Sequence, residues 1–454
     1  TGDLVTLHVN GIRYLEKAPL PYWLVAISFR IFGFNTFAAH LPQAIGVLLL
    51  AFLGFRWADR AFNTRTAFYT GLAILTSAGV FLFTRVFIPE VLLSLFLCTA
   101  LYSLLQSLSA SDSASNSAFR KNSVILSEGG AFAAGVEGPA VAVAVARSFS
   151  KLRTLSPTAH AYLMWITLAL AVLTKGLVAL VFFGGTAIAY LALTGEHKKW
   201  RTLKPITGLL LFLAIAAPWH ILAGLRNTGG MNNHGFFWFY FINEHFLRFL
   251  GRRFPKDYNK LPGYLFWTLH LVWLFPGSLF LGLWLAQRNA QWTNFIKSHT
   301  THLKRSRWAE YLPWIFAILL ADFIGWTNVL MLLFVCGIAG GFYEFHRRRR
   351  AFDQPGLPLT YLSFPQRTTL LLTLYTALVL IFFSISPNQE YYTFPAYLPI
   401  LILIAASLTQ AENTYAAEKQ SRRWITVAHA AYTAVGLGVA LTLAYGLWRS
   451  RHLS

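Results

Sequence analysis

Residues 236–259 read FFWFYFINEHFLRFLGRRFPKDYN, so a dense aromatic stretch runs directly into a charged one. Long apolar segments lie on both sides of it, at 206–223 and 264–286. Aromatic side chains prefer the headgroup level of a bilayer, where neighbouring charges still reach water. The pattern predicts a loop at a membrane surface between two membrane-crossing helices. Such a loop would meet something both apolar and anionic, and a lipid phosphate fits that description.

The composition of the whole chain is that of a membrane protein. Hydrophobic residues make up 56% of the 454 residues and charged residues 12%, whereas a soluble domain carries about 25% charged residues. The formal net charge of +21 comes from 38 Lys and Arg against 17 Asp and Glu. Because these cations cluster in loops, membrane orientation and anionic membrane lipids explain most of them. Nucleic acid is not an expected partner.

Apolar segments of membrane-crossing length recur along the chain. A spanning helix needs about 20 mostly apolar residues, and about twelve segments are candidates. They lie at 41–56, 66–84, 90–108, 160–173, 177–194, 206–223, 264–286, 311–326, 328–343, 367–385, 395–410 and 424–447. The sequence therefore predicts an all-α polytopic membrane protein, with interfacial helices in the first outer loop.

The distribution of Lys and Arg predicts which loops face the cytoplasm. The basic loops lie at 56–65, 120–153, 198–204, 297–307, 347–350 and 419–423. The other side then receives residues 1–40, 85–90, 174–176, 224–263 and 386–394. Every chemically distinctive stretch falls on that outer side, so a site facing away from the cytoplasm is expected.

These assignments divide the chain into regions. The predicted regions are an outer interfacial loop (1–40), transmembrane helices (41–108, 160–223 and 264–448), an outer loop with site residues (224–263) and a tail (449–454). The Ser-, Ala- and Gly-rich segment 109–159 is predicted to be a flexible cytoplasmic insertion. Cys98 and Cys336 lie in apolar stretches, so no disulfide framework or thiolate metal site is expected. Because the chain begins with Thr1 rather than Met, we expect a natural start and a first transmembrane helix to precede it.

Charged residues in the first outer loop are candidates for a site. Residues 10–24 read NGIRYLEKAPLPYWL, in which Pro19 and Pro21 are expected to prevent a continuous helix. Glu16 and Lys17 are open to two interpretations. They form a charge pair on an interfacial connector, or Glu16 is a metal or substrate ligand and Lys17 a phosphate contact.

Two short turns also carry ionisable residues. Arg85 and Glu90 flank a turn between two apolar helices, where charges are costly and tend to be paired or functional. They either pair with each other or belong to a site. Lys175 has no carboxylate nearby in the sequence, so a partner must come from another loop. An anionic ligand or simple exposure at the surface is the alternative.

Within the opening stretch, Glu244, His245 and Arg248 would share one face of a helix. Glu244 and Arg248 are then either a simple i,i+4 pair or part of a site. His245 together with Glu16 is a candidate divalent metal site, although a lone histidine more often makes hydrogen bonds. The cations at 252–256 lie on a predicted outer loop, against the orientation bias, which favours anion binding over a solvated basic flank.

The segment 386–392, SPNQEYY, follows one apolar helix and precedes another. Gln389, Tyr391 and Tyr392 offer hydrogen bonds and a stacking surface suited to sugars, or the tyrosines are interfacial anchors. The sequence contains no GxGxxG after a strand, no Walker motif, no HExxH and no GxSxG in a fitting context. A transferred group would therefore have to arrive already activated, as it is in a lipid-linked phosphate ester.

Several of these stretches occur in the order of one family. They are GDLVTLHVNGIRYLEKAPLPYWL, RVFIPE, LTKGLVAL, APWHI, FFWFYFINEHFLRF with PKDYN, WLFPGS, and FFSIS followed by YYTFPAYLP. Together they resemble the bacterial aminoarabinose transferase and protein mannosyltransferase family of GT-C membrane glycosyltransferases. The resemblance runs from residue 1 to about residue 400 without the segment 109–159. With one preceding helix, about thirteen spans are expected, which is similar to the family's architecture.

The resemblance implies transfer of a sugar from a polyprenyl phosphate donor to an extracytoplasmic acceptor such as lipid A. It implies a multi-pass protein of the bacterial cytoplasmic (inner) membrane whose active site faces the periplasm. The resemblance implies Lys17 and Arg248 for the donor phosphate, Glu16 and His245 for a possible divalent metal ion, and Lys175 and Tyr391 for the lining of the cavity. We also predict that Lys175 contacts the donor phosphate, that the sugar cavity includes Tyr14, Tyr392 and Gln389, and that Glu90 and Arg85 support catalysis.

This chain departs from the family at three points. Glu90 stands where the family usually has Asp, and Ala18 replaces the first of two prolines. The family's catalytic carboxylate is expected upstream of Gly2 and Asp3, and Asp3 is not assigned that role.

The reaction implied is an inverting single displacement at the sugar's anomeric carbon. A lipid-linked sugar transporter or flippase is the alternative from another class, and it would place ionisable residues at mid-membrane depth. Here they gather on one face, which favours an enzyme. A protein O-mannosyltransferase or a glycan ligase is the alternative among enzymes.

Overall fold

The structure, a computed structural model, describes residues 2–123, 155–229, 234–256, 263–287, 362–385 and 390–451. Strands occur in these ranges only as one hairpin, β1 (His8–Val9) and β2 (Ile12–Arg13), whose turn is Asn10-Gly11. Both turn residues have positive φ, which is the conformation that a two-residue Asn-Gly hairpin requires. The rest of the described chain is helical or connects helices.

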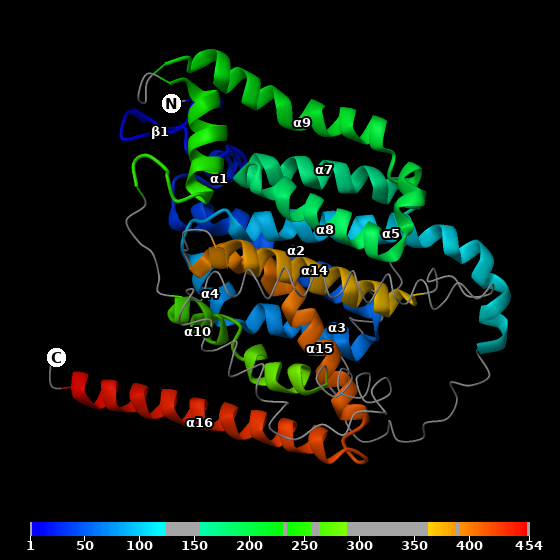
Figure 1. Ribbon diagram of the computed structural model, residues 1–454. Helices are drawn as coiled ribbons and strands as arrows, with labels where there is room; N and C mark the ends of the chain where they lie inside the picture. The colour runs from blue at the N-terminus through cyan, green and yellow to red at the C-terminus, as the bar shows by residue number, and fades with distance from the viewer. Residues whose placement is uncertain are drawn as a thin grey trace, which may run out of the picture.

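Most helices run along one direction and form a bundle (Figure 1). At its centre lies α5 (Glu90–Ser123), of whose most apolar stretch 83% is buried, against 6% for α16 (Lys419–Ser450). Against α5 pack α2 (Thr36–Ala61), α7 (Pro157–Lys175) and α8 (Val178–Thr194). The other α-helices are α1 (Leu20–Phe32), α3 (Thr64–Thr76), α4 (Ala78–Arg85), α9 (Pro205–Arg226), α10 (Gly263–Trp273), α14 (Phe364–Ile385) and α15 (Tyr397–Asn413).

Seven of the described helices are long and apolar enough to cross a membrane, or nine if two bent pairs are each one span. The predicted span 66–84 is one pair, α3 and α4, bent by 43°, and 264–286 is the other, bent by 106°. With 17 residues, α8 is shorter than these spans. Because the predicted spans 311–326 and 328–343 lie outside the described residues, the count of about twelve is not confirmed.

The two bends are joined by two hydrogen bonds to backbone carbonyls. Ser77, between α3 and α4, donates its hydroxyl to the Trp273 carbonyl at 2.7 Å. The next residue, Ala78, donates its N–H to the Phe275 carbonyl at 2.9 Å. Each break therefore supplies hydrogen-bond partners for the other, which membrane-embedded backbone requires wherever a helix is interrupted.

Helices begin where the sequence supplies capping chemistry. Asn35 caps α2 by accepting the Ala38 N–H at 2.8 Å. As expected, no helix continues through both Pro19 and Pro21, because α1 begins at Leu20 and has Pro21 in its first turn. Proline is tolerated there since the first turn has no intrahelical use for the missing N–H.

The segment 109–159 differs from its prediction at its start. Helix α5 continues through Ser123, so the first part of the predicted flexible insertion is helical. At its end, α7 begins at Pro157 and is capped by Ser156. Residues 124–154 lie outside the described part of the chain.

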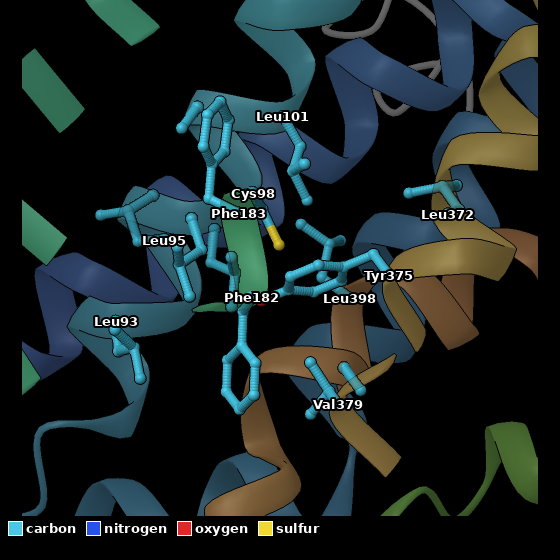
Figure 2. Close-up of a cluster of buried hydrophobic side chains, with 14 of the residues drawn as sticks. Leu93, Leu95, Cys98, Leu101, Phe182, Phe183, Leu372, Tyr375, Val379 and Leu398 are labelled. Carbon is cyan, nitrogen blue, oxygen red and sulfur yellow. The ribbon is translucent and has the colours of Figure 1, made fainter. Parts of the chain in front are cut away.

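The core joins α5, α8, α14 and α15. Figure 2 shows Cys98 of α5, Phe182 of α8, Tyr375 of α14 and Leu398 of α15 around one centre, and all four are fully buried. Close packing of this kind is what holds helices together in lipid, where the hydrophobic effect between helices is weak. The packing also fixes the start of α5 relative to the ends of its neighbours, and these ends build the site.

Candidate functional site

A cavity of about 260 Å³ lies where α5 and α8 begin and where α7 and α14 end. Its walls also include the first loop, the π-helix η3 (Trp238–Leu247) and the 3₁₀ helix η5 (Glu390–Ala396). In Figure 1 this is the end of the bundle near β1. Segments separated by hundreds of residues in the sequence therefore meet around one space.

The structure brings most of the predicted site residues to this cavity. Its lining includes Tyr14, Glu16, Lys17, Glu90, Lys175, His245, Arg248, Tyr391 and Tyr392. Arg85 is not part of the lining; it is exposed, and its guanidinium lies 4.6 Å from the centroid of the Phe81 ring. Its predicted support of catalysis therefore has no geometric basis here. Gln389 lies outside the described residues.

Glu16 and Glu244 share two arginines. Arg253 lies with Nε 2.8 Å from Glu244 Oε1 and with Nη2 2.9 Å from Glu16 Oε2. Arg248 Nη1 lies 3.2 Å from Glu244 Oε2 and 3.5 Å from Glu16 Oε1. Lys17 Nζ donates to Glu16 Oε1 at 2.6 Å. The Glu244 side chain is only 2% exposed, yet both of its oxygens are paired, as a buried carboxylate requires.

The two carboxylates have opposite pKa shifts. Burial and the neighbouring Glu16 charge raise the pKa of Glu244, against the opposing charges of Arg253 and Arg248. Burial also disfavours the ionised form of Glu16, but the charges of Lys17, Arg253 and Arg248 outweigh it and lower the pKa of Glu16. Neighbouring carboxylates whose pKa values are shifted in opposite directions are common in functional sites.

Arg253 is a site residue whose role the sequence did not reveal. It reaches Glu244 because buried Asn243 folds the following loop back: the Asn243 amide donates to the Phe254 carbonyl at 2.7 Å, and its carbonyl accepts the Phe254 N–H at 3.0 Å. The only signal was the charge run that follows the aromatic stretch. A separation of nine residues matches no helical periodicity.

Glu90 pairs with Lys175, so the alternative of an Arg85–Glu90 pair was wrong. Glu90 is the first residue of α5 and Lys175 the last of α7, and these two helices pack side by side. The partner of Lys175 does come from another loop, as its sequence context required. Both side chains are largely buried, which keeps this pair fixed at the edge of the cavity.

Tyr392 contacts two of the cations. Its hydroxyl accepts a hydrogen bond from Arg248 Nη2 at 3.1 Å, and Lys175 Nζ lies 4.0 Å from its ring centroid. The second contact has cation–π geometry. Tyr391 packs edge-on against Tyr392 at 4.9 Å between centroids. Tyr14 also lines the cavity, and burial and then the Glu16 charge raise the pKa of its hydroxyl and keep it protonated.

Both ring nitrogens of His245 form hydrogen bonds with backbone groups. The Leu177 N–H donates to Nε2 at 3.0 Å, so Nδ1 carries the proton and donates to the Tyr240 carbonyl at 2.6 Å. Gly176 permits this approach, because a Cβ there would lie 2.2 Å from Nε2 and its φ of +84° suits glycine. Burial lowers the pKa of His245, against the Tyr240 carbonyl, which keeps the ring neutral.

The residues predicted for a divalent metal ion do not fit one in this arrangement. Glu16 is surrounded by three cations, and neither nitrogen of His245 is free. Within the described ranges, no group of three or more His, Cys, Asp and Glu side chains gathers in a way that could hold a metal ion. The arrangement of the described residues therefore gives no support to the predicted metal site of Glu16 and His245.

The cations around the cavity suit an anionic ligand. Among the described residues, the linked ion pairs contain four cations, Lys17, Lys175, Arg248 and Arg253, and three carboxylates, Glu16, Glu90 and Glu244. The cations are held in place by these carboxylates before any ligand arrives. Fixed cations beside tyrosine hydroxyls and rings can bind a phosphodiester together with the sugar attached to it.

Comparison with known proteins gives both sequence and fold relatives. Residues 16–119 match the family described as dolichyl-phosphate-mannose-protein mannosyltransferase. The undecaprenyl phosphate-alpha-4-amino-4-deoxy-L-arabinose arabinosyl transferase of Aeromonas hydrophila is 26% identical over 285 residues, which are 62% of this chain and 43% of that protein. The protein of the same name from Pseudomonas savastanoi is 39% identical over 64 residues, 13% of this chain and 12% of that protein.

The fold is that of a solved membrane protein. The crystal structure of ArnT from Cupriavidus metallidurans bound to undecaprenyl phosphate matches with a TM-score of 0.53 at 20% identity. The match covers 90% of this chain and 53% of the other. This chain thus spans about half the length of that protein and 43% of the Aeromonas relative.

Proposed function

Because the chain belongs to the aminoarabinose transferase- and protein mannosyltransferase-like family of GT-C membrane glycosyltransferases, we propose that it transfers a sugar from a polyprenyl phosphate donor. The observation that carries the proposal is the meeting of Lys17, Lys175 and Arg248, from three separate segments, on one cavity. These cations are held in place by Glu16, Glu90 and Glu244, and fixed cations of this kind suit the negative charge of a sugar phosphodiester.

The reaction is a single displacement at the anomeric carbon. The acceptor oxygen forms a bond to that carbon as the bond to the phosphate oxygen breaks, and the polyprenyl phosphate leaves with the electron pair. The acceptor's proton passes to a carboxylate base. Lys17, Arg248 and Lys175 stabilise the charge that grows on the departing phosphate, and each such donor contributes about 3 kcal/mol to lowering the barrier.

The three carboxylates of the cavity orient the cations. Glu16 holds Lys17, Glu90 holds Lys175, and Glu244 holds Arg248 together with Arg253. A cation placed in advance needs no reorganisation when charge develops, which is the physical basis of electrostatic catalysis. We assign these carboxylates to positioning, and Glu90 supports the reaction through Lys175.

The acceptor in this proposal lies outside the cytoplasm, with lipid A as the first candidate. All cavity walls lie at one end of the membrane-crossing helices, where an acceptor at the membrane surface meets a donor whose prenyl chain stays in lipid. The proposed place is the bacterial inner membrane, with the cavity open to the periplasm.

The test compares lipid A and protein glycans by mass spectrometry in cells with and without the gene. We expect deletion to remove one sugar from lipid A, and Lys17→Ala or Arg248→Ala in the complete protein to reproduce the loss. Arg85→Ala is the matched control and should retain the modification, since Arg85 does not line the cavity. If deletion changes neither lipid A nor glycans, sugar transfer is rejected. A change in protein glycans alone would replace lipid A by a protein acceptor.

A further inference from the structure

We propose that His245 is a positioning residue that holds the junction between α7 and α8 and thereby fixes where Lys175 enters the cavity. The assignment of Lys175 to the donor phosphate rests on the proposed function, whereas the hydrogen bonds of His245 do not. Of the two roles that the sequence left open for this histidine, the geometry favours hydrogen bonding over metal binding.

The junction needs a hydrogen-bond acceptor from elsewhere in the chain. Helix α7 ends at Lys175, the chain turns at Gly176, and α8 begins at Val178. The first N–H groups of a helix have no intrahelical acceptor, and Leu177, at the N-cap position, makes no side-chain cap. His245 Nε2 accepts the N–H of Leu177 itself at 3.0 Å, whereas the N–H groups of Ala179 and Leu180 donate to the backbone carbonyls of Gly176 and Leu177.

The other side of the imidazole is anchored in a rigid part of the molecule. Nδ1 donates to the Tyr240 carbonyl at 2.6 Å, and the two rings lie edge to face at 4.8 Å. Tyr240 is itself buried against Phe236 and Trp219. His245 therefore ties the α7–α8 junction to a packed aromatic cluster of the outer loop.

This arrangement places the ammonium group of Lys175. Lys175 is the last residue of α7 and is followed directly by Gly176. Its side chain reaches Glu90 and the ring of Tyr392. A metal ion on Nε2 would displace the Leu177 N–H and leave it without its acceptor, at a cost that buried donors generally incur. Hydrogen bonding and metal binding by this nitrogen thus exclude each other.

Two conservative variants separate the roles of the two nitrogens. Glutamine carries its amide at the distance of Nε2 and can still accept from Leu177, whereas asparagine reaches only as far as Nδ1. The measured quantity is the rate at which an amine-reactive reagent labels Lys175 in the detergent-purified chain, read by peptide mass spectrometry. We expect His245→Gln to label within about twofold of wild type, and His245→Asn and His245→Ala to label about fivefold faster, as loss of one hydrogen bond predicts.

His270→Asn is the matched control. His270 is also buried, with Nδ1 2.6 Å from the Phe266 carbonyl and Nε2 2.6 Å from Thr393 Oγ1, but it does not line the cavity. Its substitution should leave Lys175 labelling unchanged. Equal effects of His270→Asn and His245→Asn would show general loosening and overturn the proposal.

A substitution at Gly176 would disturb the contact between His245 and the α7–α8 junction without changing His245 itself. A Cβ at Gly176 would meet His245 Nε2 at 2.2 Å, whereas a Cβ at Gly184 meets nothing within 4 Å. Gly176→Ala should therefore increase Lys175 labelling, and Gly184→Ala should not. Because Gly176→Ala also strains the backbone, the decisive measurement is the double variant with His245→Ala, whose effect should be smaller than the sum of the single effects.

Three further results would overturn the inference. They are equal labelling of the Gln and Asn variants, full additivity of the Gly176 and His245 effects, and an increase in wild-type labelling when EDTA removes metal ions. Binding of undecaprenyl phosphate to the wild-type chain, measured by native mass spectrometry, tests the proposed function separately. A chain that fails to bind this lipid yet shows the labelling pattern would lose its proposed function and keep the role of His245.

Discussion

Each end of the helix bundle contains a buried glutamate that is paired with two cations, but only one of the two glutamates lies beside the cavity described above. At the cavity end, Glu244 is paired with Arg248 and Arg253 beside an open space. At the other end, Glu196 is paired with Arg367 at 3.1 Å and with Lys199 at 3.1 Å. The 17 residues of α8 separate these ends by roughly 25 Å. Neither Glu196 nor Arg367 lines the cavity.

The comparison shows that buried charge alone does not identify a site. The end that contains Glu196 and Arg367 also has a hollow of about 370 Å³, but neutral hydroxyl and amide side chains such as Thr66, Thr409 and Asn413 line it. Among the described residues, linked ion pairs and an open space coincide at the cavity end. We therefore expect substitutions at that end to change ligand binding and substitutions at the opposite end to change stability.

The largest expected effect is on sugar transfer. Lys17→Ala and Arg248→Ala should each lower the transfer rate by about 10²–10³-fold, because each removes a fixed cation from the departing phosphate. The measurement is the transfer rate per amount of folded complete protein. A rate within twofold of wild type for either variant would remove that residue from the mechanism.

Arg367→Ala should act on the fold instead. It removes a 7% exposed guanidinium from Glu196 and should lower the free energy of unfolding by about 2 kcal/mol. Thermal unfolding in detergent measures the loss, and binding of undecaprenyl phosphate to the folded fraction should be unchanged. A variant of normal stability with weakened lipid binding would erase the distinction between the two ends.

Arg253→Ala tests whether the bridging arginine belongs to the cavity end in function as well as position. Without it, Glu16 and Glu244 lose a shared partner and should draw Arg248 and Lys17 away from the lipid phosphate. We expect undecaprenyl phosphate to bind about tenfold more weakly, which corresponds to about 1.4 kcal/mol. Its neighbour Arg252 is exposed, so Arg252→Ala should have no effect. Equal effects of the two substitutions would indicate only a loss of net charge.

The smallest effect is expected in the neutral hollow. Thr66 and Thr409 form a buried hydroxyl pair at 3.0 Å. Thr409→Val should cost about 1 kcal/mol of stability, because it removes the acceptor of the Thr66 hydroxyl. Thr66→Val should cost less, because Thr409 keeps its bond to the Ala405 carbonyl at 3.0 Å, and the double change should be nearly neutral. Thermal unfolding of the three variants measures this. Weaker lipid binding by the double variant would make this hollow part of the site.

The sequence predicted which segments would meet and did not predict how they pair. Loop charges placed Lys17, Lys175 and Arg248 on one side of the membrane, and the structure brings all three to one cavity. The pairing of Glu90 with Lys175 joins residues 85 positions apart, and no local pattern records such a contact. The pairing of Arg253 with Glu16 and Glu244 was missed for a similar reason, because a loop folded back by Asn243 has no periodicity.

One fold feature was also beyond local patterns. The stretch 238–247 was expected to follow α-helical spacing and forms a π-helix, a form whose occurrence depends on the packing around it and is common at functional sites.

The most direct test of the account is a cryo-electron microscopy structure of the complete protein with undecaprenyl phosphate. The account predicts phosphate density within hydrogen-bond distance of Lys17 Nζ and the Arg248 guanidinium, with Tyr392 beside it. Phosphate density at the exposed Arg85, or at the hollow beside Thr66, would contradict it.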